Sequence, residues 1–107
     1  MSISERPLQP LRIPSNWQVT YNEFREVDPA DAEAAAYLCE DLFQAFNGLT
    51  KILIDVGWYP DGDPEGGYVL SAHRGDFHGE ELLRREARVR ADIVAALEEA
   101  LIQFQRA

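Results

Sequence analysis

The sequence predicts an α+β fold, a two-layer sandwich in which an antiparallel sheet of about four strands carries two helices on one face. Three observations lead to this class: short segments of alternating polarity, two longer segments with the apolar period of a helix, and turn-forming glycines and prolines between them. The expected order is strand, helix, strand, strand, strand, helix. At 107 residues the chain has the size of one domain.

Residues 1–16 are expected to form an extended arm, and residues 17–107 a single domain. Three prolines in the arm each remove a backbone hydrogen-bond donor, which argues against a regular helix there. The domain opens on the segment WQVTYN, whose apolar residues alternate with polar ones, as is typical of a half-buried strand. This first strand is expected to end between Phe24 and Val27.

A helix is expected to run from Asp28 to Gly48. An aspartate followed by a proline favours a helix start, because the carboxylate accepts a free backbone amide and the proline needs no acceptor. Six apolar residues then follow at helical spacing: Ala35, Leu38, Cys39, Leu42, Phe43 and Phe46. Cys39 would be buried on this stripe as a small hydrophobic residue, rather than act as a nucleophile. Gly48 is the expected C-terminal stop.

Residues 50–59 (TKILIDVGWY) are predicted to form a central strand that is at least partly covered on both faces, because apolar and β-branched residues are nearly continuous. The glycines and prolines of residues 60–67 (PDGDPEGG) predict a turn. Residues 68–73 resume the strand pattern, so an antiparallel hairpin with a long acidic loop is expected.

The segment 80–90 is compatible with two structures. Its composition favours helix, but its apolar residues also alternate, and we favour a strand that ends near Arg88. If the segment were helical, the last helix would be about 25 residues long and the sheet would lose a strand. Residues 90–105 predict a helix with one apolar stripe: Ile93, Val94, Leu97, Leu101 and Phe104.

The formal net charge of −9 repels phosphate backbones and anionic lipid surfaces, so neither nucleic acid nor a membrane is an expected partner. Between Glu23 and Glu65 there are eleven acids and two bases, which favours a basic protein partner. Four arginines gather between Arg84 and Arg90, so a homodimer that pairs acidic and basic sides is also compatible.

The cytoplasm is the expected compartment, because the chain has one cysteine and no apolar segment typical of an export signal. No apolar run approaches the roughly 20 residues that cross a bilayer.

The acidic loop is the strongest local motif. Asp61, Asp63 and Glu65 occupy the first oxygen-ligand positions of a calcium-loop template, but Ala72 stands where the template needs a bidentate glutamate. A solvated turn is the alternative. His73 and His78, with nearby carboxylates, are candidates for a divalent metal site or an acid–base pair, although their spacing matches no established motif. No cofactor is expected.

Asp55 is unusual because it is an ionisable group within an apolar strand, where it must find a hydrogen-bond partner or titrate at higher pH. Trp58 and Tyr59 are neighbours on the same strand and must point to opposite faces. One of these rings is expected near the surface, beside the acidic loop, where an exposed aromatic residue is a favourable binding anchor.

Two segments, IPSNWQVTYNEF (13–24) and ILIDVGWYPDGDPEGGYVL (52–70), resemble small acidic bacterial proteins that are mostly uncharacterised, some of which are immunity proteins. This resemblance implies a bacterial interaction protein and assigns no site residue. The leading hypothesis is an acidic protein-binding module, an inhibitor or immunity protein for a basic partner. The alternatives are a homodimeric accessory protein and a small metal-dependent hydrolase that uses Asp55, Asp61, Asp63, His73 and His78.

Overall fold

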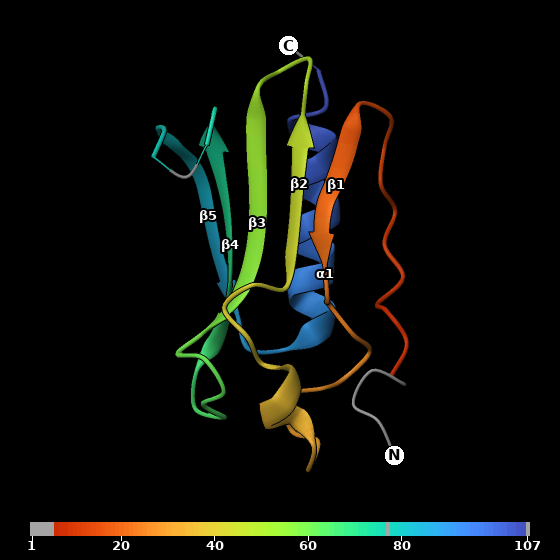
Figure 1. Cartoon of the computed structure of the whole chain (residues 1–107), viewed down its shortest axis with the longest axis vertical. Helices are drawn as coiled ribbons and strands as arrows, with labels where there is room; N and C mark the ends of the chain where they lie inside the picture. The colour runs from red at the N-terminus through yellow and green to blue at the C-terminus, as the bar shows by residue number, and fades with distance from the viewer. Residues whose placement is uncertain (1–5, 77, 107) are drawn as a thin grey trace.

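The computed structural model describes residues 6–76 and 78–106. Over these residues the chain forms one antiparallel sheet with one helix packed against it (Figure 1). The five strands follow one another in chain order: β1 Trp17–Asn22, β2 Phe43–Asn47, β3 Ile52–Tyr59, β4 Gly67–Arg74 and β5 Glu81–Ala87. The helix, α1, spans Arg90–Gln103. Parts of the expected arm and domain lie outside the described residues: 1–5, Phe77 and Ala107.

The α+β class and the antiparallel sheet are confirmed, but the expected four strands and two helices are wrong. The sheet has five strands in the described ranges, and one helix covers one of its faces. The favoured strand in the segment 80–90 is confirmed as β5. Residues 60–66 join β3 to β4 as the loop of an antiparallel hairpin, as expected.

The expected helix from Asp28 to Gly48 is wrong. This stretch is a long connection with one short 3-10 turn, Ala34–Tyr37, followed by β2. Within β2 the residues alternate between buried and partly buried positions, which fits a strand. Asn47 ends this strand, and its side-chain oxygen accepts hydrogen bonds from two backbone amides of the next turn at 2.9 and 3.0 Å. Pairing with β1 on one side and with β3 on the other outweighed the helical spacing of the apolar residues.

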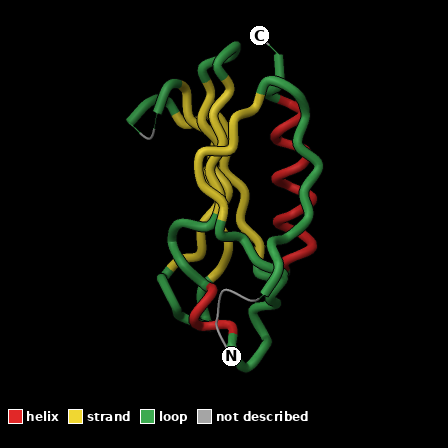
Figure 2. Tube along the Cα trace, turned by 45° about the vertical axis from the view of Figure 1, so that its right-hand side comes forward, coloured by secondary structure: helices red, strands yellow, loops and turns green. Residues whose placement is uncertain are grey.

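The hydrophobic core lies between α1 and one face of the sheet, so the molecule has two layers (Figure 2). Alternate residues of the three central strands supply its sheet side: Phe43, Ala45, Ile54, Val56, Trp58, Tyr68, Leu70 and Ala72. The buried stripe of α1 supplies the other side: Ile93, Leu97, Ala100 and Leu101. The predicted last helix and most of its apolar stripe are thus confirmed.

The described part of the arm, residues 6–16, runs along α1 on the side away from the sheet (Figure 2). The backbone amide of Arg12 donates a hydrogen bond to the Glu98 carboxylate at 2.8 Å. Where the arm enters β1, the indole nitrogen of Trp17 donates to the carbonyl oxygen of Leu101 at 2.8 Å. These contacts place the arm beside the helix and leave the opposite face of the sheet clear of it.

In the ranges that the structure describes, no helix combines the length and apolar character needed to cross a membrane.

Candidate functional site: the acidic end and the open face of the sheet

Two acidic loops lie side by side at one end of the sheet, the lower end in Figure 1. Residues 23–42 connect β1 to β2 and residues 60–66 connect β3 to β4, and together they carry ten acids and one base. The backbone amide of Glu40 donates a hydrogen bond to the Asp61 carboxylate at 3.0 Å, and a backbone hydrogen bond of 2.6 Å also joins the two loops. We call the surface formed by these two loops the acidic end.

Most carboxylates of the acidic end have no counter-ion among residues 6–76 and 78–106. Three are in ion pairs, namely Glu23 with Arg25, Asp28 with Arg90, and Asp31 with Arg6. The other seven form no ion pair with the described residues: Glu26, Glu33, Glu40, Asp41, Asp61, Asp63 and Glu65. The acidic end therefore presents concentrated negative charge to solvent.

The predicted ligand residues of the 60–66 loop have structural roles. The Asp61 carboxylate holds the neighbouring loop, as described above, and the Asp63 carboxylate accepts a hydrogen bond from the Glu65 amide at 2.8 Å. The indole nitrogen of Trp58 donates to the Asp63 carbonyl at 2.7 Å. Across residues 6–76 and 78–106, no three His, Cys, Asp or Glu side chains are grouped so that they could hold a metal ion.

The two histidines lie apart. His73 lies on β4 and faces away from α1, whereas His78 lies in the exposed turn before β5, where its amide donates to the Asp76 carboxylate at 2.8 Å. Of the residues considered for a metal or acid–base site, Asp55 and His73 line a common hollow, and Asp61, Asp63 and His78 do not line it.

Trp58 and Tyr59 point to opposite faces, as neighbours on a strand must. Trp58 is fully buried in the core, where its ring meets that of Tyr68 edge to face at a centroid distance of 4.8 Å. Tyr59 is 41% exposed, and its hydroxyl donates to the Glu40 carbonyl at 3.3 Å. Partial burial and the nearby negative charge of Asp55 raise the pKa of Tyr59, so the phenol stays neutral at physiological pH.

We call the sheet face opposite α1 the open face, because no helix of the described chain covers it (Figure 2). One row of residues in register crosses it and takes one residue from each strand: Tyr21, Gln44, Asp55, Ser71 and Arg84. Directly opposed residues have Cβ atoms about 5 Å apart, so these side chains are neighbours. The sequence did not predict this row, because Gln44 was assigned to the expected helix and not to a strand.

Asp55 lies at the centre of this row and is only 5% exposed. Its carboxyl group forms no hydrogen bond or ion pair within the described part of the chain. Burial, and secondarily the charge of Asp41, raises the pKa of Asp55 from 3.8 to about 7. Arg84 lies two strands away and is paired with Glu81 and Glu86, each at 3.4 Å. Asp55 is therefore a buried acid without a compensating cation.

Asp55 lines two hollows in the open face. One has a volume of about 330 Å³ and is completed by Thr20, Tyr21, Asp41 and Gln44. The other has a volume of about 430 Å³ and is completed by Tyr59, Val69, Ser71, His73, Glu81 and Arg84.

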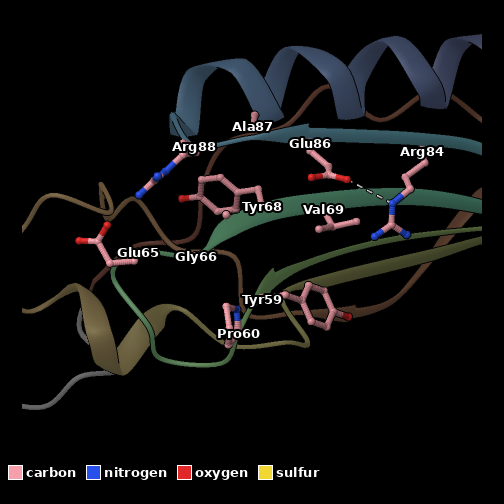
Figure 3. A pocket seen from close by; sticks show the side chains of 11 residues that line it. Tyr59, Pro60, Glu65, Gly66, Tyr68, Val69, Arg84, Glu86, Ala87 and Arg88 are labelled. Carbon is pink, nitrogen blue, oxygen red and sulfur yellow. Dashed lines mark hydrogen bonds and ion pairs between the residues drawn. The ribbon is translucent and has the colours of Figure 1, made fainter.

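A third hollow, of about 510 Å³, links the open face to the acidic end. It shares Tyr59, Val69 and Arg84 with the second hollow and extends to the 60–66 loop at Glu65. In Figure 3 the Val69 side chain lies between the Tyr59 ring and the Arg84 guanidinium. The open face and the acidic end thus form adjoining parts of one surface.

Cys39 lies in the connection before β2 rather than on a helix stripe. Burial, followed by the charges of Asp61, Asp41 and Glu23, raises the pKa of its thiol. The thiol is therefore poorly ionised near neutral pH, which argues against a nucleophilic role.

Comparisons with protein-family models, with curated proteins and with solved structures gave no match to this chain. The fold and the site therefore define the class: a small α+β domain with an open sheet face that leads into an acidic end.

Proposed function

We propose that the protein is a binding module that holds a basic protein partner against its acidic end and the adjoining open face. The observation that carries this proposal is the union of two acidic loops, distant in sequence, through the hydrogen bond from Glu40 to Asp61. Concentrated carboxylates without counter-ions attract a cationic macromolecule and increase its rate of association. They also disfavour acidic competitors, which adds specificity.

Two tyrosines give this surface apolar anchors. Tyr21 is 43% exposed and Tyr59 is 41% exposed, and both lie beside hollows of the open face. Tyrosine is enriched among the residues that dominate interface energies, because a rigid ring buries a large area at low entropic cost. Charge would guide the partner to the surface, and the rings would hold it there.

A partner held in this way would have its basic surface covered. If that surface binds nucleic acid or an acidic substrate, the complex would be inactive, and the module would act as an inhibitor of the immunity-protein kind.

The two alternative functions have less support. The hydrolase would need its five acids and histidines in one place, but Asp55 and His73 share a hollow from which Asp61, Asp63 and His78 are absent. The homodimer would need a free basic side. Arg84 and Arg90 are paired with acids of the same chain, whereas Arg85 and Arg88 are exposed and form no ion pair with the described residues, so only half of the arginine cluster is available.

Affinity capture from the native host tests the proposal with two matched double variants. Glu33→Gln with Glu65→Gln removes one exposed carboxylate from each acidic loop, and neither side chain forms a hydrogen bond or ion pair in the described chain. Glu80→Gln with Glu99→Gln makes the same change of charge elsewhere on the surface.

We expect the wild type and the second variant to capture the same basic protein, and the first variant to capture less of it. Raising the salt concentration should reduce capture, because exposed charges are screened. The absence of any basic protein, or equal capture by both variants, would contradict the proposal.

A further inference from the structure

We propose that the hollow between β1 and β3 is a receptor for an arginine side chain of the basic partner. This inference rests on the proposed function and names the chemistry of one contact within that docking surface. The hollow has a volume of about 330 Å³, and five residues line it: Thr20, Tyr21, Asp41, Gln44 and Asp55.

The polar groups of this hollow are mainly acceptors. Asp41 and Asp55 together present four carboxylate oxygens, and no cationic side chain is among the described residues that line the hollow. The Gln44 side-chain oxygen already accepts a hydrogen bond from the Thr20 hydroxyl at 2.8 Å, which holds the amide in place. A guanidinium has five N–H donors and no acceptor, and it pairs with carboxylates through two parallel hydrogen bonds. The N–H donors of a guanidinium therefore match the carboxylate acceptors of the hollow.

Asp55 supplies an independent indication of a ligand. Asp55 lines the hollow and is only 5% exposed. Its carboxyl group has no hydrogen-bond partner in the described chain. Buried polar groups in proteins nearly always have a partner, because an unsatisfied one is costly. A donor from a second molecule would satisfy this acceptor.

Tyr21 favours arginine among the cationic ligands. Its ring is 43% exposed and lines the same hollow as both carboxylates. A planar guanidinium can stack on an aromatic ring while its edge faces a carboxylate, whereas the compact ammonium of lysine acts as a point charge. A calcium ion would need six to eight oxygen ligands, and the hollow offers two carboxylates.

Binding of arginine should be coupled to ionisation of Asp55. The titratable and charged groups that line the two hollows with Asp55 lie on β1, β3, β4 and β5 and in the segment just before β2. They are Tyr21, Asp41, Tyr59, His73, Glu81 and Arg84. Burial and the charge of Asp41 raise the pKa of Asp55 to about 7, so near neutral pH part of the population carries a neutral carboxyl group. A bound guanidinium favours the ionised form. Affinity should therefore increase as pH rises through 7.

The test is an NMR titration of the full chain with the short peptide acetyl-Gly-Arg-Gly-amide. Matched peptides carry citrulline, which keeps the shape without the charge, or lysine. We expect saturable shifts at Tyr21, Asp41, Gln44 and Asp55, with about tenfold weaker binding of the citrulline peptide. The lysine peptide should fall between the two. Between about pH 6 and about pH 8, the affinity for arginine should increase about tenfold, because the ionised fraction of a group with a pKa of about 7 increases by that factor.

Two double variants locate the contact. Asp41→Asn with Asp55→Asn should remove both the preference for arginine over citrulline and the pH dependence. Glu80→Gln with Glu99→Gln makes the same change of charge outside both the hollow and the acidic end, and should preserve both. Tyr21→Leu, which leaves the carboxylates in place, should weaken arginine binding and retain the pH dependence.

The outcomes separate this inference from the proposed function. Equal binding of the arginine and citrulline peptides, or equal losses in the two double variants, would overturn the arginine receptor. Capture of a basic protein through Glu33 and Glu65 would then still support the docking surface. If the hollow prefers arginine and no basic protein is captured, the receptor stands and the proposed function fails.

Discussion

Gly57 of β3 lies against the backbone carbonyl of Glu40, so closely that a Cβ atom at position 57 would overlap the carbonyl oxygen. On either side of this contact, the backbone amide of Trp58 donates to the backbone carbonyl of Cys39 at 2.8 Å, and the backbone amide of Leu42 donates to the backbone carbonyl of Val56 at 3.0 Å. Two residues, Glu40 and Asp41, thus lie opposite Gly57, which is the arrangement of a β-bulge. The bulge brings the 23–42 loop to the 60–66 loop and places Asp41 in the hollow beside Asp55.

Gly57→Ala is expected to destabilise the fold and disturb the bulge. Overpacking of this kind costs about 1–3 kcal/mol, and here the obstacle is backbone, which cannot rotate away. Denaturant unfolding measures the loss. Gly48→Ala is the matched control, because no atom lies within 4 Å of a Cβ built there, and its stability should stay within about 0.5 kcal/mol of the wild type. Equal stabilities for both variants would contradict this expectation, because they would show that the backbone at Glu40 can shift to make room for the added methyl group at little cost.

Asn47→Ala is expected to lower the free energy of unfolding by about 3 kcal/mol, because it leaves several backbone groups without partners at a fully buried site. The side-chain oxygen accepts from two turn amides, and the nitrogen donates to the carbonyl of Gln105 at 3.2 Å. Urea unfolding of this variant beside Gln103→Ala, an exposed control on α1, checks the estimate. A loss equal to that of the control would contradict this role of Asn47.

Trp58→Phe is expected to release the 60–66 loop, because it removes the hydrogen bond from the indole nitrogen to the Asp63 carbonyl. Hydrogen exchange at the amides of Gly62 and Gly66 should become faster. Trp17→Phe is the matched control, since its indole donates to Leu101 on α1, away from that loop. We expect each variant to lose about 1–3 kcal/mol of stability. Unchanged exchange in the Trp58 variant would show that other contacts hold the acidic loop.

Asp55→Asn is expected to stabilise the protein at high pH. The pKa of Asp55 is about 7 in the folded protein, whereas the ordinary value of the group, which applies to the unfolded chain, is 3.8. Between these values the folded state binds a proton that the unfolded state has lost, so wild-type stability falls as pH rises, and the fall is complete above about pH 7. The loss is on the order of 4 kcal/mol, since one pKa unit corresponds to about 1.4 kcal/mol.

Unfolding of the wild type and the Asp55→Asn variant across about pH 4 to about pH 8 measures this effect. The variant should lack the decrease that Asp55 causes, so the difference in stability should grow with pH. Asp41→Asn should make the decrease smaller, because it removes a like charge that helps raise the pKa of Asp55. A difference that stays constant with pH would show that Asp55 is ionised throughout.

The sequence predicted the parts of the fold that depend on local pattern. Alternation in β1, the apolar run of β3 and the stripe of α1 each have one favourable packing solution, whereas the segment of β5 was compatible with either a strand or a helix. The helix predicted for residues 28–48 was wrong. The apolar residues of this segment have helical spacing, but the hydrogen bonds that decide its structure join it to other strands.

The site was predictable only in part. The sequence identified Asp55 as an ionisable group in an apolar strand and predicted that either Trp58 or Tyr59 is exposed, and the structure shows that the exposed ring is Tyr59. The acidity of the middle segment is a property of composition. The convergence of the two loops, and the meeting of Tyr21, Asp41 and Asp55 in one hollow, depend on sheet register and on the bulge at Gly57. Register across five strands cannot be deduced when one strand is taken for a helix.

The most direct test of the central claim is the footprint of the basic partner on the chain, measured by hydrogen exchange of the free and bound protein. We expect slower exchange in the loops 23–42 and 60–66 and on the open face around Tyr21 and Tyr59, with no change along the outer side of α1. Protection confined to α1 and the arm, with both acidic loops unaffected, would contradict it.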